Sequence, residues 1–213
     1  MKKFELTSET KINIFGKKLF RIKALVSFGV VKTGETGGWV EKEENVNQSG
    51  NAWVSGNARV FGNARVSGDA WVSGNAWVSG NARVFGNARV SGDAWVFGNA
   101  EVFGNAWVSG DAWVFGNAEV SGNARVSGNA EVSGNAWVSG NADYTTIHGF
   151  GTQFRTTTFF RCKDKQVKVS CGCFYGTIPE FREQVKNTRD GKIAEEYLMI
   201  ADLMEKHFAE EAK

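Results

Sequence analysis

Residues 50–143 repeat a pattern of six in which two small or branched apolar residues flank one variable residue. Ala recurs at every sixth position from Ala52, and Val follows two residues later from Val54. Side chains along a strand alternate between its faces, so Ala and Val point to one side and the residue between them to the other. A Gly-Asn or Gly-Asp pair separates the units and predicts a corner, because both residues tolerate the left-handed conformation of a sharp bend.

The repeat predicts a closed triangular coil of three hexapeptides, with the Ala and Val side chains filling its narrow interior. The fifteen complete Ala-x-Val units carry no insertion and correspond to about five coils. Sorting the position after Val by multiples of eighteen supports this coil. One column contains only Ser (Ser55, Ser73, Ser91, Ser109, Ser127), and the other two contain all the Phe (Phe61, Phe97, Phe115 and Phe85, Phe103).

The same arithmetic sorts the outward residues onto three faces. The first face carries Trp53, Trp71, Arg89, Trp107 and Arg125; the second carries Arg59, Trp77, Trp95, Trp113 and Glu131; the third carries Arg65, Arg83, Glu101, Glu119 and Trp137. Adjacent rungs lie ~4.8 Å apart, so the Trp residues of the second face are expected to stack as a ladder. Phe97 and Phe115 widen this apolar surface, and Arg83 and Glu101 are expected to form a cross-rung ion pair worth under ~1 kcal/mol.

Residues 1–49 are expected to form a small N-terminal β cap. Ile12–Gly16 and Leu19–Ile22 have the composition of two strands around a Gly-containing turn. Val46 falls in the Ala phase of the repeat that follows. A cap is needed because the open end of a β-helix exposes unpaired backbone groups.

Residues 144–213 lose the repeat and predict an α+β segment. Residues 156–161 and 166–170 have the composition of strands, and Thr177–Glu180 resembles a capping box with Pro in the first helical turn. A second helix is expected from Lys192 to Ala212, because its apolar residues recur on one face.

Composition and charge argue against several classes of function. The net charge is only +2, and the repeat carries 5 Arg against 7 acidic residues, so nucleic-acid binding is not expected. Runs of ~20 apolar residues, which a membrane span needs, are absent from the sequence. The charged start at Met1–Glu5 lacks the apolar core of a signal peptide. A cytoplasmic location is therefore expected.

Catalytic and metal-binding residues are sparse. The repeat contains no His, which leaves His148 as the weak candidate for the base of an acyltransferase-like enzyme. Cys162, Cys171 and Cys173 are weak candidates for a metal site, but their spacings lack the C-x2-C knuckle of most structural zinc sites. Free thiols in a reducing compartment are the simpler interpretation. No cofactor is expected.

The period of six, the inward Ala and Val and the Gly-Asn corners resemble the hexapeptide-repeat superfamily of left-handed parallel β-helices. That superfamily includes acyltransferases, carbonic anhydrase-like proteins and non-enzymatic scaffolds, so the resemblance implies a fold rather than an activity. The Gly-Gly-Trp-Val sequence within Val31–Glu41, leading to Trp53, is similar to the first segment of uncharacterised bacterial and prophage hexapeptide-repeat proteins. This closer resemblance implies a mobile-element origin and supplies no site residues.

The predicted protein is thus mainly β, a left-handed parallel β-helix between a β cap and an α+β segment that ends in a helix. Outward aromatic surface usually marks a contact, and Trp and Arg are frequent hot-spot residues. The expected protein-binding residues are Trp77, Trp95, Trp113, Phe97, Phe115, Trp53, Trp71, Arg89 and Trp107. The leading hypothesis is a non-enzymatic scaffold that binds a protein partner, in one form a phage-encoded inhibitor of a host defence protein. The alternatives are an acyltransferase-like enzyme and an oligomerising stalk, and the C-terminal helices or a homo-oligomer could equally cover the ladder.

Overall fold

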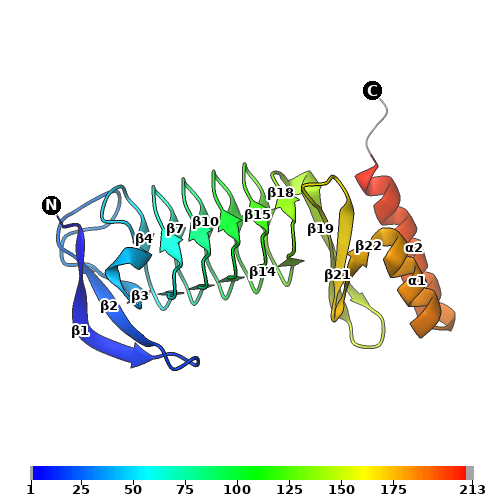
Figure 1. Cartoon of the computed structure of the whole chain (residues 1–213), viewed down its shortest axis with the longest axis horizontal. Helices are drawn as coiled ribbons and strands as arrows, with labels where there is room; N and C mark the ends of the chain where they lie inside the picture. The colour runs from blue at the N-terminus through cyan, green and yellow to red at the C-terminus, as the bar shows by residue number, and fades with distance from the viewer. Residues whose placement is uncertain (1, 210–213) are drawn as a thin grey trace.

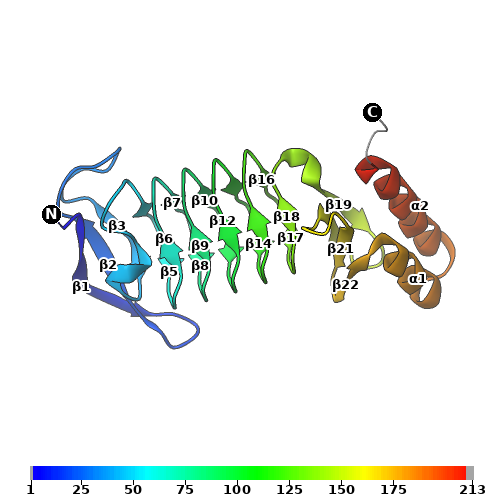
Figure 2. The same ribbon diagram turned by 45° about the horizontal axis from the view of Figure 1, so that its top comes forward.

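The computed structural model describes residues 2–209 and shows an elongated molecule with three parts along its long axis (Figure 1). An antiparallel hairpin lies at the N-terminal end, and a solenoid of stacked coils forms the middle. A four-stranded sheet and two helices lie at the C-terminal end (Figure 2). The prediction of a mainly β solenoid is confirmed.

Each hexapeptide forms one short strand from its outward residue and the Val that follows. The strands are β4 (Trp53–Val54), β5 (Arg59–Val60), β6 (Arg65–Val66), β7 (Trp71–Val72), β8 (Trp77–Val78), β9 (Arg83–Val84), β10 (Arg89–Val90), β11 (Trp95–Val96), β12 (Glu101–Val102), β13 (Trp107–Val108), β14 (Trp113–Val114), β15 (Glu119–Val120), β16 (Arg125–Val126), β17 (Glu131–Val132) and β18 (Trp137–Val138). Each of these strands pairs in parallel with the strand eighteen residues away, as Trp77 does with Trp95. Three parallel sheets result, and the coil of three hexapeptides is confirmed.

The solenoid begins earlier than the repeat does. Strand β3 (Thr36–Val40) pairs in parallel with β5, and Val46 forms a parallel bridge with Val66. The solenoid therefore has about six turns instead of the predicted five, and its first coil lies within the segment assigned to the cap. The repeat count missed this coil because a 3-10 helix, η1 (Glu43–Asn45), replaces the regular corner.

Ala and Val fill the interior of the solenoid as predicted. The repeat Ala from Ala52 to Ala136 and the repeat Val from Val54 to Val138 are all fully buried. Burial of apolar surface contributes roughly 25 cal/mol per Å², so these two columns stabilise each coil through the hydrophobic effect.

The corners use Gly and Asn differently, and only Gly adopts the left-handed conformation that both residue types tolerate. The corner Gly from Gly50 to Gly134 have φ between 58° and 72°, whereas Phe154 and Lys165 are the only non-Gly residues with positive φ in residues 2–209. The Asn residues instead form ladders along the solenoid. In one of them the Asn63 amide donates to the amide oxygen of Asn81, 3.2 Å away.

The N-terminal hairpin consists of β1 (Phe4–Ile12) and β2 (Lys18–Ala24), and β2 pairs with β3. The prediction of a strand at Ile12–Gly16 is wrong beyond Ile12, the last residue of β1, because residues 13–17 form the turn of the hairpin. The side-chain oxygen of Asn13 accepts hydrogen bonds from the backbone N–H groups of Phe15 and Lys17 and so holds the turn.

The C-terminal segment follows a second 3-10 helix, η2 (Asn141–Asp143). Its elements are β19 (Tyr144–Phe150), β20 (Arg155–Arg161), β21 (Val167–Cys171), β22 (Phe174–Thr177), α1 (Ile178–Thr188) and α2 (Gly191–Phe208). The strands predicted at 156–161 and 166–170 are confirmed within one residue, and so is the capping box, in which Thr177 Oγ1 accepts from the backbone N–H of Glu180. The part of the second predicted helix at 210–212 lies outside the described residues.

The antiparallel sheet β19–β22 separates the solenoid from the two helices. Phe160 and Cys162 belong to the core of the solenoid, whereas Phe159 packs with Phe181 and Met204 of the helices. The helices thus cover the outer face of this sheet and not the Trp ladder. Between residues 2 and 209 no helix is long and apolar enough to cross a membrane.

Candidate protein-binding surface

The second face of the solenoid carries the predicted stack of Trp side chains. The ring centroids of Trp77 and Trp95 lie 4.8 Å apart with an interplanar angle of 4°, and those of Trp95 and Trp113 lie 5.3 Å apart at 9°. Strands β8, β11 and β14 place these residues on successive rungs of one sheet, so the stack follows from the parallel register.

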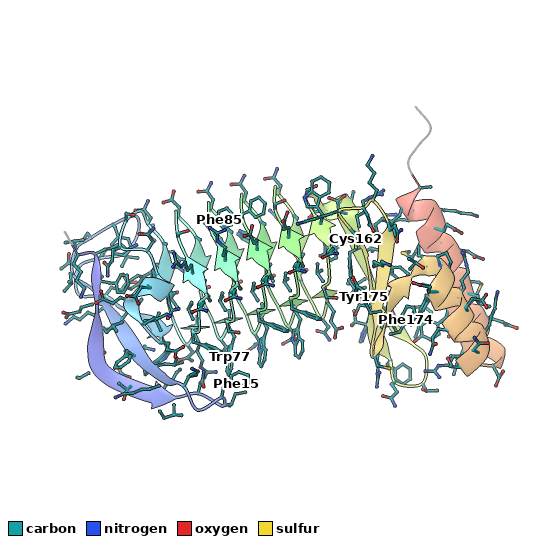
Figure 3. The ribbon with its side chains drawn as sticks, viewed as in Figure 1. Phe15, Trp77, Phe85, Cys162, Phe174 and Tyr175 are labelled. Carbon is teal, nitrogen blue, oxygen red and sulfur yellow. The ribbon has the colours of Figure 1, made fainter. Side chains whose placement is uncertain are left out.

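The N-terminal hairpin covers the first part of this face. Leu19 packs with Trp39, Phe61 and Trp77 in a buried cluster. Phe15, in the turn of the hairpin, has its ring centroid 5.9 Å from that of Phe61 and 5.8 Å from that of Trp77 (Figure 3). Trp77 is only 7% exposed. Trp77 is therefore a packing residue and does not belong to the exposed surface on which the sequence analysis placed it.

The rest of the face forms an exposed aromatic strip, defined here as Trp95, Phe97, Trp113 and Phe115. Phe97 and Phe115 stack at 4.9 Å, and Phe97 meets Trp113 edge to face at 6.1 Å and 79°. Trp113 is 41% exposed and the other three side chains are half-buried. These four predicted residues come together as one uncharged surface.

The hairpin turn extends the apolar surface with residues that the sequence analysis did not select. Ile12, Ile14 and Phe15 are 64%, 75% and 58% exposed. Of these, Phe15 is connected to the strip, because its ring contacts Trp77, which stacks on Trp95. The sequence signal for them is an apolar pair between Asn13 and Gly16, which are turn residues, but the same residues also have the composition of a strand.

On the first face of the solenoid, the N-terminal segment buries Trp53. This side chain is fully buried, with the rings of Phe28 and Phe4 packed edge to face against it at 5.4 and 6.3 Å. The predicted role of Trp53 in binding a partner required exposure, and the structure contradicts it. Trp71 is half-buried and donates its indole N–H to Ser55 Oγ at 3.0 Å.

Further along the first face, Trp107 lies between two Arg side chains. The guanidinium groups of Arg89 and Arg125 each lie 5.3 Å from the Trp107 ring, a cation–π arrangement. Trp107 and both Arg residues are exposed. This group is a second, mixed aromatic and cationic surface on a different side of the solenoid.

The third face carries charged side chains on four successive rungs and then the exposed Trp137, with the stacked rings of Phe85 and Phe103 beside it. Arg83 and Glu101 form the predicted cross-rung ion pair, with 3.2 Å between Nη1 and Oε1. Lys163 of the C-terminal segment reaches back to Glu119 at 2.6 Å. Because these pairs are partly exposed to solvent, they contribute at most ~1 kcal/mol each.

The candidate catalytic and metal-binding residues do not assemble into a site. His148 is exposed on β19, where its Nδ1 lies 3.1 Å from Thr156 Oγ1. Burial raises the pKa of the Cys162 thiol to about 11, so this side chain is a protonated core residue at neutral pH. Cys171 accepts a hydrogen bond from Thr157. Over the described part of the chain, no three His, Cys, Asp or Glu residues are grouped so that they could hold a metal ion.

Comparison with known families gives one match. The YdcK beta solenoid repeat matches five overlapping segments, at residues 52–68, 58–74, 64–80, 76–92 and 82–98. The matched segments all lie within the solenoid and span about a fifth of the chain. The repeats of this region are therefore similar to those of the YdcK β-solenoid. No curated protein matches the chain.

Proposed function

We propose that this protein is a non-enzymatic scaffold that binds a protein partner through the aromatic strip. The observation that carries the proposal is the exposure of Trp113 beside Trp95, Phe97 and Phe115, on a face that the N-terminal hairpin covers only in part. Contiguous exposed aromatic surface is uncommon on soluble monomers and usually marks a contact surface.

The solenoid favours such a role because it holds the strip rigidly. The backbone of β11 and β14 is hydrogen-bonded to rungs on both sides, and the aromatic rings are stacked on one another. Few side-chain rotamers remain to be fixed on binding, so little of the binding free energy is lost to ordering. Trp side chains at the centre of an interface commonly carry a large share of its affinity.

The resemblance to hexapeptide-repeat proteins of prophages supports two finer parts of the proposal. One is a left-handed winding of the coils. The other is a partner that belongs to a host cell, with inhibition of a defence protein as one form of that interaction. The proposed binding role depends only on the aromatic strip, so it does not require either of these two parts to be correct.

Affinity capture with matched variants tests the proposal. The full chain and the Trp113→Ala/Phe115→Ala variant are immobilised and exposed to a bacterial lysate, with Trp137→Ala as the control, because Trp137 is comparably exposed on the third face. We expect one protein to be retained by the full chain and by the control, and at least tenfold less of it by the double variant. Equal retention by all three proteins would show that the strip is not the binding surface.

A further inference from the structure

The contact of the N-terminal hairpin with the solenoid shows how a pair of aromatic rings there binds a third aromatic side chain. Phe61 and Trp77 meet edge to face, with centroids 5.8 Å apart and planes at 79°. Phe15 lies against both rings, tilted at 38° to Phe61 and edge to face with Trp77 at 78°. The short turn that follows Asn13 sets the position of Phe15. A tight turn therefore places one aromatic ring against a pair of rings.

The same pair of rings recurs two coils later within the exposed strip. Phe97 and Trp113 stand thirty-six residues after Phe61 and Trp77 and meet at 6.1 Å and 79°. Trp113 is 41% exposed where Trp77 is 7% exposed, because the hairpin does not extend this far. One difference separates the two places. Phe115 stacks on Phe97, whereas the small Ser79 occupies the corresponding position beside Phe61, so a third ring of the solenoid is already present at the second place.

The backbone at this place offers nothing to a partner strand. Strand β14 has β11 on one side and β17 on the other, and its N–H and C=O groups are used by these neighbours. A partner therefore cannot add a strand along the strip, and recognition must come from side chains. The strip presents four uncharged aromatic rings, and for its contact we expect an apolar side chain.

We propose that the Phe97–Trp113 pair binds an aromatic side chain presented on a tight turn of the partner protein, as Phe61 and Trp77 bind Phe15. This inference rests on the proposed function and specifies the chemistry of the partner at that same surface. Edge-to-face contacts between aromatic rings are worth more than the burial of their area alone, which gives an aromatic residue an advantage over an aliphatic one.

A peptide copied from the hairpin turn tests the inference directly. The probe is residues 11–18 (KINIFGKK) joined head to tail, and the control is the same ring with Phe15→Ala. Each is titrated into the full chain while the Trp indole N–H signals are followed by NMR, with Trp113→Phe and Trp77→Phe used for assignment. We expect the Trp113 signal to shift with the probe, about tenfold more weakly with the control peptide, and the Trp77 signal to stay in place because Phe15 already covers that ring.

Four outcomes would overturn the inference. Equal shifts with both peptides would show that the aromatic ring is not what is recognised, and shifts confined to Trp107 or Trp137 would place the contact elsewhere. Self-association in sedimentation runs that Trp113→Ala abolishes would make a second copy of the chain the occupant. If the peptide fails while partner capture still depends on Trp113, the strip remains a binding surface and only the turn-borne aromatic is ruled out.

Discussion

At the scale of single residues, the corner of each hexapeptide assigns different tasks to Gly and Asn. Gly92 has φ +69°, and a Cβ atom there would lie 2.9 Å from the backbone nitrogen of Gly110 in the next coil. Gly128 occupies the same column with φ +65°, but nothing lies within 4 Å of the position of its Cβ. Each of these corners thus requires Gly for its left-handed backbone conformation. Inside the stack, Gly is also required because neighbouring coils approach too closely for a Cβ atom.

These two residues allow the conformational and steric costs to be separated. Gly128→Ala is expected to lower the free energy of unfolding by about 1–2 kcal/mol, the cost of a left-handed Ala. Gly92→Ala is expected to cost about 1–3 kcal/mol more, because the new methyl group also crowds the next coil. Urea unfolding of both variants measures the difference. Equal losses would mean that the coils have room to separate at Gly92.

Lys3 is a buried charge at the N-terminal end of the solenoid. Its Nζ donates to the carbonyl oxygens of Gly50 and Ala52, at 3.2 and 2.9 Å. Burial lowers the pKa of Lys3 to about 8, a shift that the charge of Asp69 partly offsets. Lys3 therefore satisfies two carbonyl groups of an early coil while its protonated form is disfavoured by loss of hydration.

This pKa predicts how stability changes with pH. Between pH 8 and pH 10.5 the unfolded chain binds more protons at Lys3 than the folded chain, so raising the pH favours folding. Relative to Lys3→Met, the unfolding free energy of the parent protein is expected to rise across this window by up to about 3 kcal/mol. The pKa of Cys162 is raised to about 11, so this thiol makes the unfolding free energy fall as the pH rises. The fall is the same in the parent and in Lys3→Met, and it cancels when the two unfolding free energies are subtracted. Urea unfolding at several pH values measures the effect, and a flat difference would contradict it.

At the scale of elements, the period of eighteen could be read from the sequence, but the coverage of the faces could not. The strict Ala-x-Val spacing assigned Trp77, Trp95 and Trp113 to one sheet because a parallel stack leaves no freedom in register. Which of them is covered depends on where the hairpin β1–β2 folds back, and its sequence has no repeat to fix that direction. The same limit applies to Trp53, which is buried by residues outside the repeat.

The contact between the hairpin turn and the ladder can be measured by two neighbouring substitutions. Phe15→Ala removes the ring that packs on Phe61 and Trp77 and is expected to lower the unfolding free energy by about 1 kcal/mol. Ile14→Ala, at a side chain that is 75% exposed, is expected to change it by less than about 0.5 kcal/mol. Thermal or urea unfolding compares them, and an equal or larger effect of Ile14→Ala would show that the turn packs differently.

At the scale of the whole molecule, the solenoid is a stack of equivalent coils closed at both ends by different structures. Phe4 and Ile22 belong to the core at the N-terminal end, and Phe160 and Cys162 belong to it at the C-terminal end. Each coil contacts mainly its neighbours, so the stability of such a stack is approximately a sum over coils and their interfaces. The number of coils can then change without altering the ends, provided that the faces stay in register.

Deletions of different length test this description of the molecule. Deleting residues 80–97 removes one full coil and brings Trp113 onto the rung after Trp77, whereas deleting residues 80–85 turns everything beyond the cut by one face and puts Glu101 there instead. Both proteins are expected to fold, with lower Tm values than the parent. In the full-coil deletion Trp77 lies next to Trp113, so Trp77→Phe should weaken the exciton-coupled circular dichroism of the stacked indoles. In the other deletion Trp95 and Trp113 move together onto the first face and stay stacked, so Trp77→Phe should leave that signal unchanged. An equal effect of Trp77→Phe in the two deletion proteins would mean that the Trp stack does not depend on the eighteen-residue register.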